Sequence, residues 1–441
     1  MNANLPNPFN ITYPTAVQTS LHSQASFARF DPTGRFVAAG LPNGSARIWD
    51  LGTKSTVRWL DGHVKGVTSV DWSKHSRYVL TSSKDWNVIV WDIASDTDPP
   101  RRVTTVRFDA PVTSAAFHPR NSQILLVLLS IGEAYIVDLR KEHRGRFELF
   151  EPADDAMDAE SSRHRAAMTV ARFDPSGRHA FVGTSNGYVL VFNTRTKSLV
   201  ARHKINGAGI MKGLDFAKGG RRLATNSSDR TLRQFNLPFY SSSQTTILES
   251  ELEPTYRFTD PINKVAWHTM SYSPDGEWLA GGAADNAAHK IYVWDIVNEG
   301  QFAATLDGGR EPLIHVHWHP NKPTIASTTN QGNILIWHCP TPERWGAFAG
   351  GFEEVDENVE YEEREDEFDI EDESVVLARQ QATEDEPVDI LSRTPQSSPT
   401  ITRATLNGTD EDEDNHWASE EPDEDYAGWK MKVLMEDEED A

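Results

Sequence analysis

Val90-Trp91-Asp92 ends a run of β-forming residues, and its pattern recurs along the chain. Seven copies are present: Ile48-Trp49-Asp50, Val90-Trp91-Asp92, Ile136-Val137-Asp138, Val191-Phe192-Asn193, Gln234-Phe235-Asn236, Val293-Trp294-Asp295 and Ile336-Trp337-His338. Most successive copies lie about 40–45 residues apart, which is the length of a four-stranded propeller blade. Two longer spacings imply insertions. The period therefore predicts a repeat protein built from seven small β-units.

Turn motifs separate the expected strands within each repeat. Residues 28–35 (ARFDPTGR) and 171–178 (ARFDPSGR) are nearly identical, and 270–277 (MSYSPDGE) follows the same pattern. Proline presets φ and glycine supplies positive φ, as a hairpin turn requires. A second turn precedes the closing strand at Asn43-Gly44, Asn186-Gly187 and Asp229-Arg230, where two-residue hairpin loops fit. Each repeat is thus predicted to be a meander of short strands.

One meander cannot bury both of its faces, but seven meanders stacked in a ring can, and a ring also hides most strand edges. We therefore expect an all-β fold, with an N-terminal arm over 1–16 and a seven-bladed β-propeller over 17–340. The last strand, Ile334–Trp337, needs a neighbour, which Val17–His22 can supply. The two insertions, at 154–165 and 237–260, are polar and predict surface loops.

The repeats resemble the WD40 family over about residues 20–340. Gly62-His63, Asp85 and Trp91 of the second repeat form the fullest copy of its signature. The resemblance implies that this His, Asp and Trp form a buried hydrogen-bonded cluster, so we interpret them as structural residues and not as a catalytic dyad. Other repeats depart from the signature, and only three keep Trp-Asp. The fold prediction depends on the seven periods rather than on one cluster.

The charge of the chain is unevenly distributed. Of the net −23, residues 341–441 contribute 34 acidic against 7 basic side chains, while residues 1–340 hold 36 basic and 32 acidic ones. A segment that is rich in acidic residues and poor in aliphatic ones buries too little apolar surface to offset the conformational entropy that it would lose on folding. We expect a hinge over 341–373 and an acidic disordered tail over 374–441. The single cysteine, Cys339, fits a reducing compartment, and no apolar stretch is long enough to predict a membrane contact.

Two clusters could suggest chemistry. His315, His317 and His319 alternate along one expected strand and share a face, but no cysteine or carboxylate cluster completes a metal-ligand set. Residues 218–222 (KGGRR) resemble a phosphate cradle, yet they occupy the turn position of the fifth repeat. Nucleotide-binding, serine-hydrolase and zinc-protease motifs do not occur. The sequence predicts a protein that is not an enzyme, with no catalytic residue, metal or cofactor.

Isolated hydrophobic residues lie between the acidic residues of the hinge. An aromatic stretch at 345–352 precedes 355–373, where Val, Tyr, Phe and Ile are spaced between acids. Such spacing favours a motif that becomes ordered when it binds a partner. The alternative is that these hydrophobic residues are incidental to the composition of the segment. This run directly follows seven repeats and resembles the hinge of the retinoblastoma-binding-protein-five family. That family includes the fungal propeller subunit of the COMPASS histone methyltransferase complex.

The resemblance implies a nuclear scaffold and activating subunit of an enzyme that methylates lysine 4 of histone H3. The segment implied to contact the SET-domain methyltransferase contains Trp345, Phe348, Phe352, Val355 and Val359. The segment implied to bind a SPRY-domain subunit contains Tyr361, Glu362, Arg364, Glu365, Phe368, Asp369, Ile370 and Glu371. A second WD40 propeller subunit is expected to bind Val388, Asp389 and Ile390. Arg230 and Arg310 resemble family positions that face nucleosomal DNA, although ordinary solvated charge is the alternative.

A generic WD40 adaptor is the other function that the sequence allows. A ubiquitin-ligase substrate receptor or an acidic-tailed histone chaperone would share the fold, and fold alone does not decide function. The discriminating feature is the hydrophobe-bearing segment Trp345–Glu373, which a purely charge-driven chaperone would not need.

Overall fold

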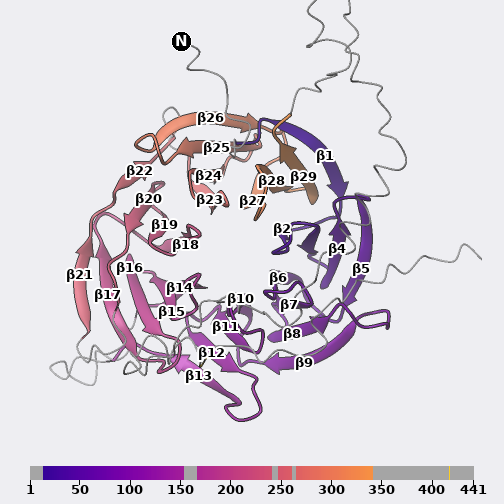
Figure 1. The fold of residues 1–441 in the computed structure, drawn as a ribbon, viewed down its shortest axis with the longest axis horizontal. Helices are drawn as coiled ribbons and strands as arrows, with labels where there is room; N and C mark the ends of the chain where they lie inside the picture. Colours follow the sequence, from indigo (N-terminus) through magenta and orange to yellow (C-terminus); the bar gives the residue numbers. More distant parts are fainter. Residues whose placement is uncertain (1–12, 153–165, 241–246, 261–264, 341–416, 418–441) are drawn as a thin grey trace, which may run out of the picture. The chain divides into compact units, whose positions relative to one another are not determined.

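The computed structural model describes residues 13–152, 166–240, 247–260, 265–340 and 417. Within these residues the strands form seven sheets, which stand as blades around a central axis (Figure 1). The predicted all-β, seven-bladed propeller is confirmed. In the described part of the chain, no helix has the length and apolarity needed to cross a membrane.

The blades follow one another around the ring in chain order. Blade one contains β2 (Phe27–Phe30), β3 (Phe36–Gly40), β4 (Ser45–Asp50) and β5 (Ser55–Asp61). Blade two contains β6 (Val67–Trp72), β7 (Tyr78–Ser83), β8 (Asn87–Asp92) and β9 (Arg101–Arg107). Blade three contains β10 (Val112–Phe117), β11 (Ile124–Leu129), β12 (Ala134–Asp138) and β13 (Gly145–Leu149).

Blade four contains β14 (Met168–Phe173), β15 (His179–Thr184), β16 (Tyr188–Asn193), β17 (Leu199–Ile205) and β21 (Leu248–Leu252). Blade five contains β18 (Met211–Phe216), β19 (Arg222–Ser227), β20 (Leu232–Asn236) and β22 (Tyr256–Phe258). Blade six contains β23 (Trp267–Tyr272), β24 (Trp278–Ala283), β25 (Lys290–Asp295) and β26 (Gln301–Asp307). Blade seven contains β27 (Leu313–Trp318), β28 (Thr324–Thr329), β29 (Asn333–His338) and β1 (Ala16–His22).

Strand direction gives the ring two distinct faces. The turn between the second and third strands of each blade lies at the same end as the loop that leads to the next blade; for example, Asn330 N donates to Pro312 O at 2.8 Å. We call this end the upper face. The lower face carries the turn between the first and second strands and the end of the third strand. Chain direction therefore places Pro340, just after β29, on the lower face.

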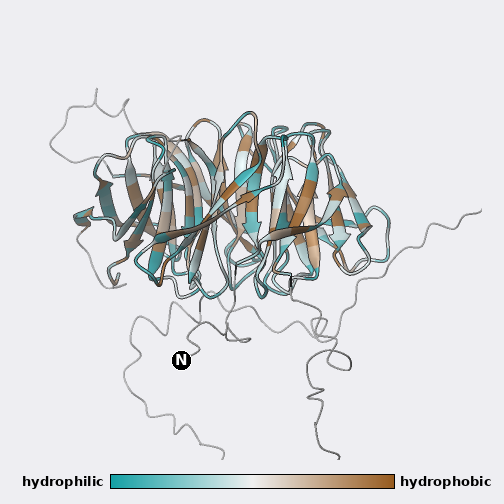
Figure 2. Cartoon of the chain, turned by 90° about the horizontal axis from the view of Figure 1, so that it is seen from above, coloured by the Kyte–Doolittle hydropathy of each residue, from teal (hydrophilic) through white to brown (hydrophobic). Residues whose placement is uncertain are grey.

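The hydrophobic core lies between neighbouring blades. Apolar clusters span adjacent blades, and side views show apolar segments alternating with polar ones along the strands (Figure 2). The second strand of blade three, Ile124–Leu129, reads ILLVLL, and all six of its residues are buried. A strand covered by blades on both sides has no solvent face, which explains an unbroken apolar run where a two-layer sandwich would show alternation.

The two ends of the ring meet in blade seven. β1 pairs antiparallel with β29, placing Leu21 opposite Ile334 and Val17 opposite Trp337. Leu21 is 3% exposed and belongs to the cluster shared with blade one. The predicted closure by Val17–His22 is confirmed, so the outer edge of β29 is paired rather than open.

The insertion at 237–260 is more than the surface loop that its polarity predicted. Its strand β21 pairs in parallel with β17 of blade four, and β22 then returns to pair with β20 of blade five. Ser250 contacts the buried His203 at 2.8 Å. The prediction was wrong here because Leu-Glu-Ser-Glu-Leu has strand alternation that a reading by charge overlooked. The other insertion, 154–165, lies outside the described residues.

Candidate interaction surfaces

The signature cluster of blade two is a structural network. His63 Nδ1 contacts Asp85 Oδ2 at 3.0 Å, His63 Nε2 contacts Thr81 Oγ1 at 2.8 Å, and Trp91 Nε1 donates to the same hydroxyl at 2.9 Å. Burial lowers the pKa of His63, an effect that outweighs the opposing influence of Asp85. These hydrogen bonds connect the strands of the blade to the loop that precedes it. This agrees with the prediction that His63, Asp85 and Trp91 are structural residues.

Blade seven contains a similar network that the sequence analysis did not identify. His289 Nε2 contacts Ser327 Oγ at 2.8 Å, and Trp337 Nε1 donates to the same hydroxyl at 2.8 Å. The histidine comes from blade six rather than from the loop that follows β26. Because His289 does not lie in the loop before the blade, a search for the Gly-His signature could not find it. Trp337 was recognised as the aromatic residue of the seventh repeat.

The three alternating histidines, two in β27 and one directly after it, lie at the seam between blade seven and blade one. His317 Nδ1 accepts a hydrogen bond from Phe30 N at 3.4 Å, and His319 Nε2 donates to Gly34 O at 2.9 Å. Burial lowers the pKa of His315 to about 4 and the pKa of His317 well below its usual value. In the part of the chain that the structure describes, no cluster of three His, Cys, Asp or Glu residues could hold a metal ion.

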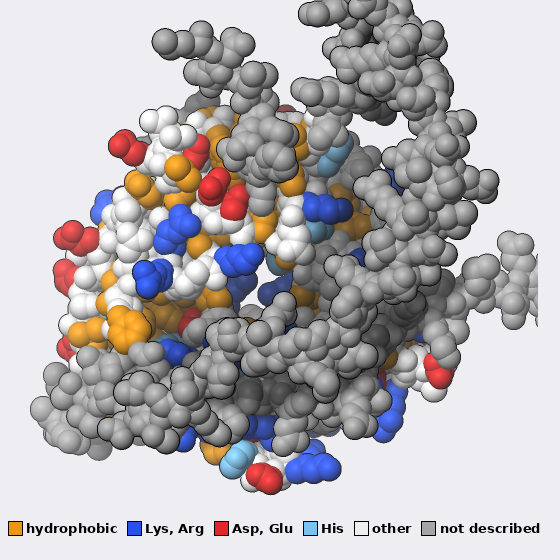
Figure 3. All heavy atoms as spheres, in the orientation of Figure 1, with side chains coloured by type: hydrophobic (Ala, Val, Ile, Leu, Met, Phe, Trp, Pro, Cys, Tyr) orange, Lys and Arg blue, Asp and Glu red, His pale blue; other side chains and the backbone are white. Residues whose placement is uncertain are grey.

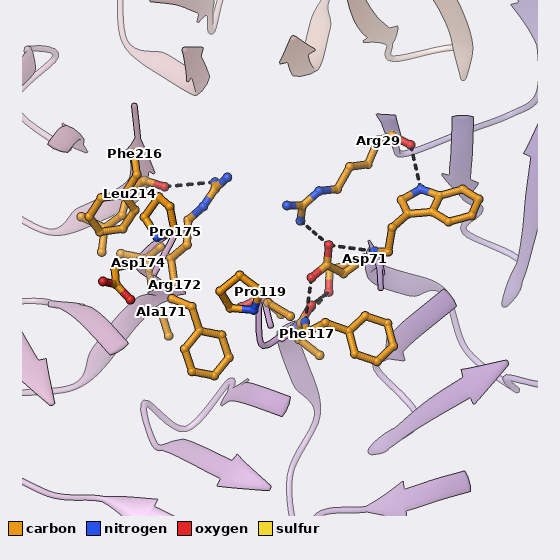
Figure 4. Close-up of a pocket in the computed structure, with 18 of the residues that line it drawn as sticks. Arg29, Asp71, Phe117, Pro119, Ala171, Arg172, Asp174, Pro175, Leu214 and Phe216 are labelled. Carbon is orange, nitrogen blue, oxygen red and sulfur yellow. Dashed lines mark hydrogen bonds and ion pairs between the residues drawn. The ribbon is translucent and has the colours of Figure 1, made fainter. Parts of the chain in front are cut away.

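The central channel of the ring carries opposed arginines. Figure 3 shows a hollow at the centre with Lys and Arg side chains visible inside it, and a cavity of about 550 Å³ opens there. Arg29 pairs with Asp71 at 3.0 Å, Arg172 pairs with Asp215 at 2.8 Å, and the two guanidinium groups point toward one another (Figure 4). Asp71 Oδ2 also accepts from Phe117 N at 2.7 Å, so the carboxylate joins blade two to blade three.

The glycine-rich stretch 218–222 is a hairpin turn, as its position predicted. Gly220 has φ +70 and its N–H donates to Ala217 O at 2.8 Å, which closes the turn between β18 and β19. Lys218 and Arg221 line a cavity of about 610 Å³ on the lower face, beside Phe239, which is 74% exposed. These residues give the lower face of blades four and five a basic and partly apolar surface.

Arg230 and Arg310 lie on the upper face, in agreement with the turns predicted for them. Both are exposed. Arg230 occupies the tight turn between β19 and β20 with φ +67, and its carbonyl accepts a hydrogen bond from Trp267 Nε1 at 3.0 Å. Arg310 lies in the loop that joins β26 to β27. The backbone of Arg230 is therefore held in place.

An exposed tryptophan also lies on the upper face. Trp86 has φ +74 in the turn between β7 and β8, where the corresponding turns of other blades have Gly44, Gly132, Gly187 and Gly332 at positive φ. A bulky side chain in this backbone region is strained. Trp86 is 39% exposed and the nearby Arg107 guanidinium lies 6.0 Å from its ring. From the sequence, this turn was recognised only through Asp85 of the blade-two signature.

Comparisons with known proteins identify the family. A model described as "WD domain, G-beta repeat" matches residues 16–50 and 54–92. The Set1 complex component swd1 of Schizosaccharomyces pombe is 36% identical over 380 residues, which cover 85% of this chain and 91% of the relative. The chain belongs to the Swd1 family.

Other Swd1-family relatives extend the match. The retinoblastoma-binding protein 5 homolog of Drosophila melanogaster is 34% identical over 88% of this chain and 76% of its own length. The crystal structure of the Myceliophteria thermophila Cps50 (Swd1) β-propeller domain superposes with a TM-score of 0.67 at 29% identity. It covers 74% of this chain and all of that domain. The resemblance to the retinoblastoma-binding-protein-five family is confirmed.

The other predicted binding residues of this Swd1-family member lie outside the described residues. They are the SET-domain contact segment Trp345, Phe348, Phe352, Val355 and Val359; the SPRY-partner segment Tyr361, Glu362, Arg364, Glu365, Phe368, Asp369, Ile370 and Glu371; and the second-propeller motif Val388, Asp389 and Ile390. These assignments stay predictions. The described part of the chain provides the ring to which these segments are attached at Pro340.

Proposed function

We propose that this protein is a non-catalytic scaffold and activating subunit of a nuclear complex that methylates lysine 4 of histone H3. The observation that carries the proposal is the relationship to Swd1-family proteins, whose members in Schizosaccharomyces pombe and Saccharomyces cerevisiae are named as components of the Set1 complex and of COMPASS. The match to these two relatives extends over 85% and 89% of this chain.

The described ring has the properties of a rigid scaffold. Backbone N–H groups donate to side-chain hydroxyls across the inner strands of neighbouring blades: Val316 N donates to Thr269 Oγ1 at 2.9 Å, and Trp318 N donates to Ser271 Oγ at 3.1 Å. The polar cluster around His63, whose two ring nitrogens both have partners, connects strands within the core. Buried networks whose members are satisfied make a structure rigid and specific. The chemistry in the complex is therefore assigned to the SET-domain subunit.

The hinge supplies the partner contacts in this proposal. Trp345 to Val359 bind the SET domain and favour its closed form, and Tyr361 to Glu371 bind a basic groove on the SPRY-domain subunit. Val388, Asp389 and Ile390 bind the second propeller subunit. Acidic residues steer the encounter, while aromatic and aliphatic anchors supply most of the affinity.

The upper face is assigned to the nucleosome. Arg230 and Arg310 are exposed on this face, and residues 1–340 carry a small excess of basic side chains. Contacts between arginine and phosphate position a protein on DNA without reading its sequence. This role suits a scaffold that must hold a methyltransferase near a histone tail.

The test is reconstitution with purified subunits. The full chain, the SET-domain subunit and the SPRY-domain subunit are mixed, and co-elution on size exclusion and methyl transfer to a histone H3 peptide are both measured. We expect one co-eluting complex whose turnover falls at least tenfold when this chain is omitted. A generic adaptor would neither co-elute nor change the turnover, and that result would overturn the proposal.

A further inference from the structure

The first strands of the blades share a polar position next to the central channel, and two arginines depart from its pattern. We call the residue before the last of each first strand the ring position; from blade one to blade seven it is Arg29, Asp71, Ala116, Arg172, Asp215, Ser271 and His317. In four blades its side chain accepts a hydrogen bond from the next blade: Asp71 from Phe117 N, Asp215 from Tyr272 N, Ser271 from Trp318 N and His317 from Phe30 N. Arginine has no acceptor atom. Arg29 and Arg172 therefore occupy the ring position for another reason.

Their ion pairs use only part of each guanidinium group. Arg29 Nη1 contacts Asp71 at 3.0 Å. Arg172 Nη2 contacts Asp215 at 2.8 Å, and Arg172 Nη1 donates to Leu214 O at 3.3 Å. A guanidinium group carries five N–H donors, and the side chains of Arg29 and Arg172 are 31% and 38% exposed. Donors of both groups therefore stay open to the channel, where Figure 4 shows them on opposite sides.

The carboxylates beside the channel are already engaged by the fold. Each accepts a hydrogen bond from a backbone N–H group: Asp71 from Phe117 N at 2.7 Å, Asp215 from Tyr272 N at 2.8 Å and Asp174 from His179 N at 3.1 Å. Lys74 and Lys212 also line the cavity, and both are exposed. Burial and then repulsion from Arg29 and Arg172 lower the pKa of His315, another lining residue, to about 4. The cations thus give the channel a positive potential.

The four cations lie at different heights along the channel. Arg29 and Arg172 share one level, near the lower ends of β2 and β14. Lys212 lies three residues before the ring position of β18, which places it about 10 Å nearer the upper face. Lys74 follows the end of β6 by two residues, at the lower mouth. The cavity of about 550 Å³ that they line is in the size range of small-molecule sites.

Phosphate groups suit these donors better than the carboxylates of an acidic peptide. The arginine fork binds phosphate through two parallel hydrogen bonds, and lysine binds it as a point charge. A phosphate ester carries about 1.5–2 negative charges near pH 7, so one group can contact two cations. An extended peptide turns successive side chains to opposite sides and offers one charge at each. Cations that converge from several blades therefore favour a compact ligand with several phosphate groups.

We propose that the central channel binds a compact organic polyphosphate, held by Arg29 and Arg172 from opposite walls and by Lys212 and Lys74 toward the two mouths. Ala116 occupies the ring position of blade three and lines the same cavity, which leaves room beside the arginines. The carboxylates of Asp71 and Asp215 are 8% and 7% exposed and hold the arginines in place before a ligand arrives. Less conformational entropy is lost on binding when the donors are held in advance.

The test is isothermal titration calorimetry of the full chain with two probes, myo-inositol hexakisphosphate and ATP, at the same ionic strength. The inositol compound presents phosphate groups in several directions and can reach both walls at once, whereas ATP carries a single phosphate chain. We expect one inositol hexakisphosphate per chain, bound at least tenfold more tightly than ATP. Equal affinity for the two probes would overturn the arrangement in which both walls hold the ligand.

Charge-neutral substitution separates the arginine from the net charge. Arg172→Gln plus Asp215→Asn removes the ion pair without changing the net charge or leaving a buried charge unpaired, and should weaken inositol hexakisphosphate at least tenfold. Asp215→Asn alone keeps the arginine and should bind at least as tightly as wild type. Unchanged affinity of the double variant would overturn the role of Arg172.

The exposed lysines provide a test that does not disturb the buried pairs. Lys212→Ala plus Lys74→Ala should weaken inositol hexakisphosphate at least fivefold, and thermal unfolding of the ligand-free variant within a degree or two of wild type would show that the ring still folds. Undiminished affinity would mean that the probe does not occupy the channel.

Two further results would overturn the proposal. Arg230→Ala plus Arg310→Ala removes two arginines of the upper face outside the cavity and is the matched control; if it weakens the probe as much as the channel variants do, the probe binds the surface proposed for DNA. Displacement of the probe by an equal concentration of a polyglutamate peptide would mean that the channel takes an acidic peptide instead. None of these measurements depends on methyltransferase activity.

Discussion

His319 Nε2 donates a hydrogen bond to Gly34 O at 2.9 Å, which joins blade seven to blade one across the closure of the ring. The same arrangement joins blade three to blade four, where His118 Nε2 contacts Gly177 O at 2.8 Å. Both glycines lie in the Asp-Pro-x-Gly turns and have φ +78 and +79. In each case a His-Pro at the end of an inner strand docks on the first turn of the next blade.

Gly34→Ala should destabilise the propeller strongly. An alanine Cβ at this position would lie 2.1 Å from the His319 ring, and its φ of +78 is a region that L-residues with a side chain avoid. We expect a loss of about 2–3 kcal/mol, from backbone strain and the displaced hydrogen bond together. Gly219→Ala is the control, because no atom lies within 4 Å of its added Cβ. Equal melting temperatures for both variants would contradict the role of Gly34.

Stability should fall as the pH drops below neutral. Burial lowers the pKa of His118, His203, His289 and His315 to about 4. In the unfolded chain these groups titrate near 6.5, so between pH 6.5 and 4 the unfolded state binds protons that the folded state does not. Their contribution to the free energy of unfolding is fully present above pH 6.5. It is lost as the pH falls toward 4, by up to about 1.4 kcal/mol per pH unit for each histidine. Melting temperatures from pH 7.5 to 4.5 test this.

His118→Gln separates titration from hydrogen bonding. A glutamine amide can donate to the Gly177 carbonyl as the imidazole does, but it does not titrate. We expect this variant to show a shallower decline of melting temperature with falling pH than wild type. A decline as steep as that of wild type would mean that His118 does not contribute to the acid sensitivity.

Closure by the N-terminal strand should depend on Leu21. Leu21 is 3% exposed in the cluster between blades seven and one, so Leu21→Ala removes buried contacts and should cost about 2–3 kcal/mol. The neighbouring Ser20 is exposed on the same strand, and Ser20→Ala should change stability by less than about 0.5 kcal/mol. Thermal unfolding of the two variants checks the difference. Similar values would show that β1 adds little to the ring.

The sequence predicted the ring because its signal is repeated. Trp91, Trp294 and Trp337 each end a third strand, and the period between such positions indicates a blade whatever the individual residues are. Closure of the ring could be predicted because the seventh repeat lacks an outer strand, which residues before the first repeat can supply. These arguments depend only on strand period and on unpaired edges, which are local in sequence.

Contacts between distant residues could not be predicted in the same way. The pairing of β21 with β17 depends on a segment that crosses back over a whole blade, and Leu248 and Leu252 give no sign of which edge they join. The stripe at His315 and His317 was recognised, but not the strand that it contacts. Arg140 and Lys197 both lie near the Trp417 ring, at 4.4 and 5.5 Å from its centroid, although they are separate in sequence and belong to blades three and four.

The upper-face arginines should affect binding to nucleosomes electrostatically. If Arg230 and Arg310 each neutralise one DNA phosphate, the double variant Arg230→Ala plus Arg310→Ala should reduce the slope of log affinity against log salt by about 2. Arg101→Ala plus Arg144→Ala removes the same charge from the lower face and is the matched control. Gel-shift titrations at several salt concentrations give both slopes. An unchanged slope for the upper-face variant would mean that these arginines are ordinary solvated charge.

The hinge aromatics should control activation of the methyltransferase. Phe348 and Phe352 are four residues apart with Ala349, Gly350 and Gly351 between them, which lets the backbone approach a partner closely. A ligand that binds only the closed form of a SET domain raises its population by the difference in affinity and no more. Burying two such rings contributes roughly 1.5–3 kcal/mol each, and ordering the segment removes about 2–5 kcal/mol. The surplus allows about a ten- to hundredfold change in the closed population.

Phe348→Ala plus Phe352→Ala should therefore reduce turnover on a histone H3 peptide by at least tenfold in the reconstituted complex, while the melting temperature of the propeller stays unchanged. The matched control is Ile401→Ala plus Leu406→Ala, which removes two large apolar side chains from a part of the tail that has no assigned partner. If the aromatic variant activates as well as wild type, the hinge does not act on the SET domain through these rings. If turnover falls only together with the melting temperature, the rings serve the fold of this chain instead, and activation must come from another of its surfaces.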